Sequence, residues 1–551
     1  MTPERLVTLQ PSRVSASRAL INRAMRDRWS ICRSLFDIDS GGSGTAKYQI
    51  DIGGWPFTFI VYSFEPQKAG RTDRIIGSAW DMMAALVEGD MSAADVERTR
   101  EELPRLYEGR ATPGTLIWCR SNRSSRLFNH VVESLASGNQ PDTTLLASAG
   151  YAMRNTGIDG NGTFGTKTFL AYEKDHPLRW SLAAQMLSAY MMRVFAVDLL
   201  NTLARQAAAV SAELAPEIAR YLGIGNASGL GLVLFVNNHP RVIDRWLTIR
   251  ERALYAAKQL NLSSDAQPLD LLVRLVEKAI VFRRQDRLRY EVFESSGQIA
   301  DDLEQVRELL QRERQKIREN PHVPRSLGPI CEDLSDRICA AALETLHSLM
   351  IELVPDFADG LVDSLALEEE LDSSPQMRVG ELKRVIEEEY RWVFGADLSS
   401  ERSRRFIWYK SRAAEEPRRG PREELSESAV NLGLDLPRLV VGLFEDLRRA
   451  DSRDSTARFL AQHPWHRAIG IRVQSLAGSP YHSFWGDMMS DGFTPAHIIH
   501  LMNAGVHGID KAQDYLGRWV RGVLFHGAPL AEELGSGQAE QHWFYPAEPS
   551  T

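Results

Sequence analysis

Cysteine is scarce in this sequence. The four cysteines among 551 residues, Cys32, Cys119, Cys331 and Cys339, are too few and too scattered to form a disulfide framework. Cys331 and Cys339 have no second pair nearby, so a cysteine-rich zinc site is not indicated either. We therefore expect a protein of a reducing compartment, the cytoplasm.

Long apolar runs and a strong excess of one charge are also missing. The most apolar stretch, 186–200, is interrupted by Arg193 and Asp198, so we expect no membrane span. The net charge is −8, from 65 basic and 73 acidic residues. Because such a balance produces no global field that would attract nucleic acid, we do not expect a nucleic-acid partner, and any anion site must be local.

The common enzyme signatures are absent too. The sequence contains no phosphate-binding P-loop, no dinucleotide-binding fingerprint, no Gly-x-Ser-x-Gly pentapeptide and no kinase signature set. These absences leave the reaction, the substrate and the cofactor unassigned. Helical proteins hold flavin, haem or metal between facing helices, and no ligand motif here favours one of them.

Apolar residues recur at helical spacing along most of the chain, which predicts a mainly α, multi-helix globular fold. One β-hairpin is expected near the N-terminus, over about 46–63, because alternating β-favouring residues flank the turn Gly53-Gly54. Residues 17–36 are expected to form a surface helix. The other predicted helices are 92–106, 178–212, 241–260, 267–284, 297–319, 333–353, 377–395 and 436–461.

A chain of this length predicts two or more subdomains. We expect an N-terminal helical segment with the hairpin (1–150), a central helical domain with two glycine-rich loops (151–320) and a C-terminal helical domain (321–551). The last contains an acidic stretch, 352–372, with eight acids and no base, and a basic segment, 402–422, with eight bases and two acids. Such runs are typical of solvated faces, although the two could also pair with each other.

The first candidate site is the glycine-rich segment 154–167. Glycines and short polar side chains allow backbone N–H groups to converge on a phosphate or carboxylate. A long loop whose glycines serve turns is the alternative. The candidate ligand-binding residues are Arg154, Asn155, Asn161, Gly162, Gly165 and Lys167.

The second candidate site is the segment 223–240, whose binding candidates are Asn226, Ser228 and Asn237. Pro240 suits the first position of a helix, which places His239 at a positive helix N-terminus. His239 is our first candidate for acid/base chemistry because histidine titrates near neutral pH, although a capping role is the alternative. Whether 230–236 is strand or helix stays open.

The third candidate site is the basic segment. Its aromatic residues and Lys410, Arg412 and Arg418 offer a stacking face and donors for an anion. Lys410 is the second acid/base candidate, and Glu416 is included among the substrate-binding residues. A small anionic ligand is favoured over nucleic acid, because this is a single basic patch in an acidic protein.

Histidines are concentrated near the C-terminus. His497, His500 and His507 could share one helical face, as a metal site needs. No glutamate completes a His-Glu-x-x-His motif and Gly505 weakens the helix, so no metal ligands are assigned.

These features favour a soluble enzyme acting on a small anionic metabolite, such as a carboxylate, a phosphate ester or an acyl thioester. The alternative is a non-catalytic helical interaction or regulatory protein, which would use the heptad-bearing helix 297–319 as a docking face. A nucleic-acid-associated protein is the third hypothesis and requires the basic residues of 13–33 and 402–422 to share one face. A homo-oligomer is compatible with all three.

Overall fold

The computed structural model describes most of the chain. Its described residues are 3–65, 80–102, 114–125, 127–155, 172–180, 182–228, 240–262, 267–285, 295–365, 377–400, 407–408, 418–419, 435–454, 456, 459, 462–474, 500–510, 512–514 and 520–549.

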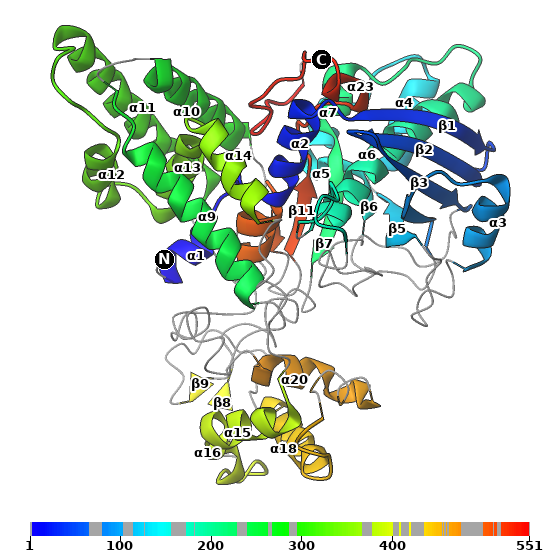
Figure 1. Cartoon of the computed structure of the whole chain (residues 1–551), viewed down its shortest axis with the longest axis vertical. Helices are drawn as coiled ribbons and strands as arrows, with labels where there is room; N and C mark the ends of the chain where they lie inside the picture. The colour runs from blue at the N-terminus through cyan, green and yellow to red at the C-terminus, as the bar shows by residue number, and fades with distance from the viewer. Residues whose placement is uncertain are drawn as a thin grey trace.

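The central feature of the fold is a nine-stranded mixed sheet (Figure 1). The prediction of a mainly α protein with one small hairpin is therefore wrong. Strands β1 to β6 form an antiparallel meander, β6 and β7 are parallel, and β7, β11 and β10 are antiparallel. In spatial order the strands are β1 (Ser30–Ile38), β2 (Gly44–Ile52), β3 (Trp55–Ser63), β4 (Met82–Glu88), β5 (Thr115–Arg123), β6 (Tyr151–Asn155), β7 (Gly223–Ser228), β11 (Val520–Leu524) and β10 (Ala512–Asp514).

The central strands lack the alternation that would have revealed them. In β4, Met82, Ala84 and Leu86 join the main hydrophobic core, while Met83 and Ala85 join a second, smaller core on the opposite face. A strand that is buried on both faces reads as a continuous apolar run, and methionine, alanine and leucine also favour helix. The sheet spans all three sequence ranges that were expected as separate units.

The N-terminal hairpin is confirmed, and the helix before it is shorter than predicted. Strands β2 and β3 meet at Gly53 and Gly54, which both have positive φ angles, 62° and 91°. The predicted helix over 17–36 is wrong in its second half. Helix α2 (Ala16–Arg26) ends before Arg28, whose φ is 53°, and the chain continues as β1 because this strand pairs along the whole of β2.

Helices cover both faces of the sheet. Helix α6 (Ala183–Ala207) crosses one face, where the hydroxyl of Ser188 lies 3.4 Å from Cys119 Sγ on β5. Within the described residues α6 is the only helix long and apolar enough to span a membrane, but most of it is buried, which is typical of the core helix of a soluble protein. Helix α3 (Ala93–Glu102) covers the other face, and Ser92 and Asp95 exchange hydrogen bonds at its start. The sheet is flanked by α4 (Phe128–Ala136), α5 (Thr143–Ala149), α7 (Pro216–Tyr221) and α23 (Ala531–Leu534).

Two glycines of the second candidate segment, Gly223 and Gly225, lie in a strand. A Cβ atom on Gly225 would lie 2.7 Å from the ring of Tyr151, and one on Gly223 would lie 2.3 Å from the carbonyl oxygen of Leu524. A side chain at either position would overlap a neighbouring strand, so only glycine fits at these positions. The interpretation of 223–228 as the start of a loop is wrong, since these residues form β7.

A second group of helices packs at one side of the sheet (Figure 1). Helices α10 and α11 pack against each other and run antiparallel. Two ion pairs show this orientation, since Arg284 pairs with Asp301 and Arg314 pairs with Asp270. The apolar seam predicted in 297–319 is buried, as expected for a helix pair within the fold. The group comprises α1 (Pro3–Thr8), α9 (Pro240–Lys258), α10 (Gln267–Gln285), α11 (Ser296–Glu319), α12 (Gly328–Ser335), α13 (Ala340–Ile351) and α14 (Pro355–Ser364).

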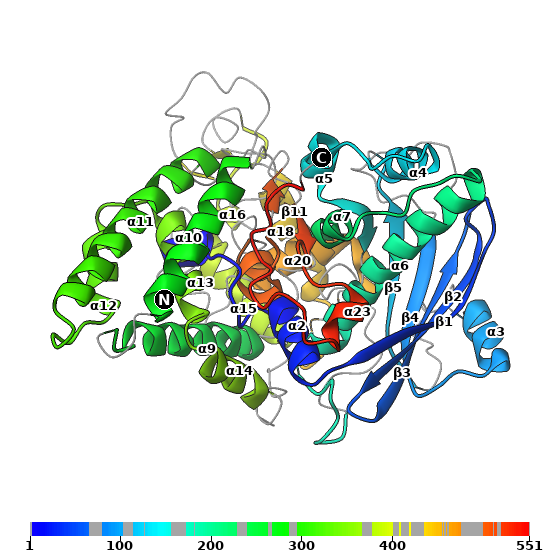
Figure 2. The ribbon, with the colours of Figure 1, turned by 90° about the horizontal axis from the view of Figure 1, so that it is seen from above.

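The N-terminal segment is buried between the sheet and this helical group, beside the C-terminal residues (Figure 2). Its arginines pair with the described part of the acidic stretch. Arg13 contacts Glu352 and Asp359, and Arg18 contacts Glu352 while stacking 4.0 Å from the ring centroid of Phe544. Glu352, Asp359 and Asp363 of this stretch are therefore partners of the N-terminal arginines, so the stretch is not a purely solvated face.

A smaller helical group follows in the sequence. Its helices α15, α18 and α20 pack on one another. The basic segment contributes a two-stranded sheet, in which Ile407 pairs with Arg419 and Trp408 with Arg418. The elements are α15 (Val379–Glu389), α16 (Arg391–Phe394), β8 (Ile407–Trp408), β9 (Arg418–Arg419), α18 (Asp435–Leu447), η4 (Pro464–His466) and α20 (Arg467–Gln474).

The close approach at Gly225 can be tested by adding one methyl group. Gly225→Ala should lower the free energy of unfolding by about 1–3 kcal/mol, because the new Cβ overlaps the Tyr151 ring. Gly360→Ala is the matched control, since a Cβ there meets nothing within 4 Å and α14 should gain up to about 1 kcal/mol of helix propensity. Urea unfolding measures both, and equal stability of the two variants would contradict the β6–β7 register.

The buried ion pairs predict a second stability difference. Glu352→Gln should destabilise the fold by about 3–5 kcal/mol, because Arg13 and Arg18 lose a carboxylate that is shielded from water. Asp301→Asn removes an exposed partner of Arg284 and should cost about 1 kcal/mol or less. Calorimetric melting compares the two, and similar losses would show that the buried contacts do not hold the N-terminal segment.

Candidate functional site

The parallel pairing of β6 and β7 brings candidate residues from two distant segments together. Asn155 pairs in register with Asn226, and Arg154 pairs with Gly225. Because the two strands are parallel, the chain leaves both at the same edge of the sheet, directly after Asn155 and Ser228. The two predicted glycine-rich segments therefore continue from neighbouring points. In mixed and parallel sheets, ligands bind preferentially beyond such carboxyl ends.

Three polar side chains share one face at this edge. Asn155 lies opposite Ser121 of β5 and Asn226 of β7, and residues directly opposite in paired strands point to the same face. The hydroxyl of Ser121 donates to Asn155 Oδ1 at 3.2 Å, and all three residues are buried. Cys119, two residues before Ser121, contacts α6, so this is the face that α6 covers.

Arg154 lies on the opposite face of β6, in register with Asn122. Both are buried, so a guanidinium group lies within the protein at this end of the sheet. The neighbouring Asp81 accepts a hydrogen bond from the backbone N–H of Arg123 and donates its own N–H to Asn122 Oδ1. We call Ser121, Arg154, Asn155 and Asn226 the strand-end site.

Two of these side-chain positions were missed from the sequence. Ser121 and Asn122 lie in the last part of β5, where no glycine or turn signal marks them, and only the pairing of β5 with β6 places them beside the candidates. A sequence pattern reports neighbours along the chain, so it could not have indicated them.

The other candidates are described in part or not at all. Ser228 and Arg418 lie in β7 and β9, where only the backbone is described. Pro240 is the first residue of α9, as predicted, so His239 directly precedes this helix. The candidates outside the described residues are Asn161, Gly162, Gly165, Lys167, Asn237, His239, Lys410, Arg412 and Glu416, together with the stretch 230–236.

The C-terminal histidines are internal where they are described. His500 Nε2 lies 3.0 Å from the carbonyl oxygen of Leu9, and His507 is fully buried at the end of the π-helix η5 (Leu501–His507). His497 lies outside the described residues. Within the described ranges no three His, Cys, Asp or Glu side chains lie close enough to hold one metal ion.

Burial lowers the pKa of His507 to about 3. Neither ring nitrogen of His507 has a hydrogen-bond partner among the described residues. The imidazole is therefore neutral at neutral pH, and the fold loses stability when the ring must take up a proton.

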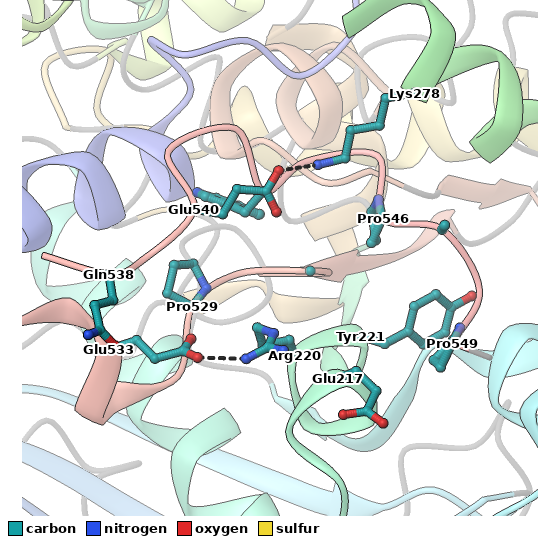
Figure 3. Close-up of a pocket in the computed structure, with 13 residues that line it drawn as sticks. Glu217, Arg220, Tyr221, Lys278, Pro529, Glu533, Gln538, Glu540, Pro546 and Pro549 are labelled. Carbon is teal, nitrogen blue, oxygen red and sulfur yellow. Dashed lines mark hydrogen bonds and ion pairs between the residues drawn. The ribbon is translucent and has the colours of Figure 1, made fainter. Parts of the chain in front are cut away.

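A cleft of about 420 Å³ lies at the opposite end of β7 (Figure 3). It opens between α7, α10 and the segment after β11. Its basic residues are already paired, Arg220 with Glu533 at 2.6 Å and Lys278 with Glu540 at 2.8 Å. The lining residues are Glu217, Arg220, Tyr221, Lys278, Gly527, Pro529, Glu533, Gln538, Glu540, Trp543, Pro546, Ala547 and Pro549.

No protein-family model matches this sequence, and no curated protein or solved structure is detectably similar to it. Function must therefore be inferred from the chemistry of the residues that the fold brings together.

The burial of His507 predicts a specific pH dependence. The unfolded histidine has a pKa near 6.5, above the folded value, so the stability that comes from burying the neutral ring is complete above about pH 6.5 and is lost as the pH falls towards about 3. Between about pH 6 and pH 4 this residue should contribute a slope of up to about 1.4 kcal/mol per pH unit.

His507→Leu should remove this slope, whereas His322→Leu, at an exposed position, should leave it unchanged. Urea unfolding at several pH values measures the difference. An unchanged slope in His507→Leu would mean that the imidazole is not held neutral by burial.

Proposed function

We propose that this chain is an enzyme that acts on a small anionic metabolite bound at the strand-end site. The ligand class is a carboxylate, a phosphate ester or an acyl thioester. The observation that supports the proposal is the parallel pairing of β6 and β7, because the two glycine-rich segments leave these strands at one edge, next to buried polar side chains.

The proposed roles follow from the chemistry of the residues. Asn155, Asn226 and Ser121, which share one face, orient the ligand through neutral hydrogen bonds. The buried guanidinium of Arg154 lies on the other face of β6 and contributes positive potential at the same strand end. Lys167 adds a second cation from the segment that follows β6. His239, immediately before α9, moves the proton, since histidine serves as acid or base near neutral pH. Lys410, Arg412 and Arg418 are further candidates from the basic segment.

The two alternatives have less support among the described residues. The apolar seam of α11 is buried against its neighbours, so it is not free to dock a partner. The nucleic-acid hypothesis needs free arginines in 13–33, but Arg13, Arg18 and Arg23 are paired with carboxylates. We retain the non-catalytic interaction protein as the second candidate.

A cytoplasmic location is part of the same proposal. None of the four cysteines forms a disulfide, and Cys119 and Cys331 are buried. Burial raises the pKa of Cys119 to about 12 and that of Cys331 to about 11, which keeps both thiols protonated and unreactive. Free thiols of this kind suit a reducing compartment.

The proposal predicts anion binding that depends on the strand ends. Thermal unfolding is measured with inorganic phosphate, malonate and citrate. At least one of these anions should stabilise the fold, and the gain should be about 2.7 kcal/mol at a concentration of a hundred times its Kd. Asn226→Ala should weaken this binding about tenfold, equivalent to about 1.4 kcal/mol, because one amide is lost.

The matched control is Asn139→Ala, at an exposed position remote from the strand ends. Once a substrate is identified, His239→Ala should abolish most of the turnover while the melting temperature stays near that of the unaltered chain. The proposal fails if no anion binds saturably, or if Asn226→Ala and Asn139→Ala bind it equally.

A further inference from the structure

The cleft at the other end of β7 has firmly held walls. The guanidinium of Arg193, fully buried in α6, donates to the carbonyl oxygens of Leu222, Ala528 and Pro529, which ties the end of α7 to the segment after β11. The backbone N–H of Gly527 donates to the carbonyl oxygen of Arg220. A volume of about 420 Å³ between fixed elements is the size of an ordinary small-ligand site.

The C-terminal residues form the remaining wall and are anchored in the same way. Lys278 Nζ donates to the carbonyl oxygen of His542 as well as to Glu540, and Gln285 Oε1 accepts from the backbone N–H of Glu548. The guanidinium of Arg18 lies 5.5 Å from the ring centroid of Trp543. The shape of the cleft therefore does not depend on a ligand.

The charges of the cleft favour a cation. Two basic side chains face three carboxylates, and both bases are already paired, so Glu217 has no ion-pair partner among the described residues. An anion would have to displace Glu533 or Glu540 from its base. An ammonium group can form an ion pair with Glu217 while both existing ion pairs stay in place.

Apart from Gln538, the rest of the lining is apolar or aromatic. Tyr221 and Trp543 are almost fully buried, and Pro529, Pro546 and Pro549 complete the surface (Figure 3). Aromatic and proline rings suit the methylene groups of an organic cation, which an inorganic ion does not have.

We propose that this cleft binds an aliphatic amine, with its ammonium group on Glu217 and its methylene chain against Tyr221 and Trp543. The site is separate from the strand-end site, since Tyr221 precedes the first residue of β7 and Asn226 lies near its last. The cleft therefore accepts a ligand of opposite charge to that proposed for the strand ends.

The experiment compares three ligands of the same chain length on the full chain at low ionic strength. Cadaverine is the diamine, glutarate the dicarboxylate and pentanediol the neutral analogue, and isothermal titration calorimetry measures each. Cadaverine should bind saturably, while glutarate and pentanediol should give no saturable heat from this cleft.

Glu217→Gln should weaken cadaverine binding about tenfold, equivalent to about 1.4 kcal/mol, because the neutral amide cannot pair with the ammonium group. Glu213→Gln is the matched control, since that carboxylate is exposed, pairs with Arg205 and does not line the cleft.

Three outcomes would overturn the proposal: no saturable binding of cadaverine, equal binding to the two variants, or binding of pentanediol as strong as that of cadaverine. If glutarate binds to the Glu217→Gln variant but not to the Asn226→Ala variant, that binding occurs at the strand-end site. The experiment therefore tests the two proposals independently.

Discussion

The buried carboxylate of Glu352 is the contact on which the arrangement of this protein depends. It accepts from Arg13, lies 3.8 Å from Arg18 and lies 3.4 Å from His542, so the N-terminal segment, the end of α13 and the C-terminal residues meet at one point. Burial by itself would raise the pKa of Glu352, but a hydrogen bond with His542 and the charges of Arg13 and Arg18 hold it below its usual range. A charge in such surroundings is tolerated only while its partners stay in place, so this contact fixes the position of all three segments relative to one another.

Both candidate ligand sites follow from how this centre joins the sheet. Strand β11 comes from the last part of the chain and pairs with β7, which in turn pairs in parallel with β6. One end of β7 carries the strand-end site, and the other end leads into the cleft. The two sites differ in chemistry. One has amides and a hydroxyl on one face, with an arginine on the other face of β6, whereas the other has a glutamate with no ion-pair partner among the described residues, beside aromatic rings. A single short strand thus separates the site proposed for an anion from the cleft proposed for an amine.

The buried polar groups around these sites also show which residues serve structure rather than chemistry. Arg193 is fully buried and satisfied by backbone carbonyl oxygens, so it acts as a structural clamp. Glu344 pairs with Arg250 and Arg5, and their charges lower its pKa although burial alone would raise it. His507 stays neutral because nothing compensates its burial. Strongly shifted pKa values in this protein therefore occur at packing contacts, and the candidate sites are recognised by geometry instead.

The sequence by itself determined the local elements. The glycine turn of the 46–63 hairpin, the helix start at Ser92, the first position of Pro240 and the buried seam of 297–319 depend on turn chemistry, capping and periodicity within a few residues. Only the tertiary structure decided the nine-stranded sheet, because its central strands are buried on both faces and carry no alternation. It also paired Asn155 with Asn226 and the N-terminal arginines with the acids after residue 351. Such contacts join residues dozens to hundreds of positions apart, and no local pattern records which distant segments will meet.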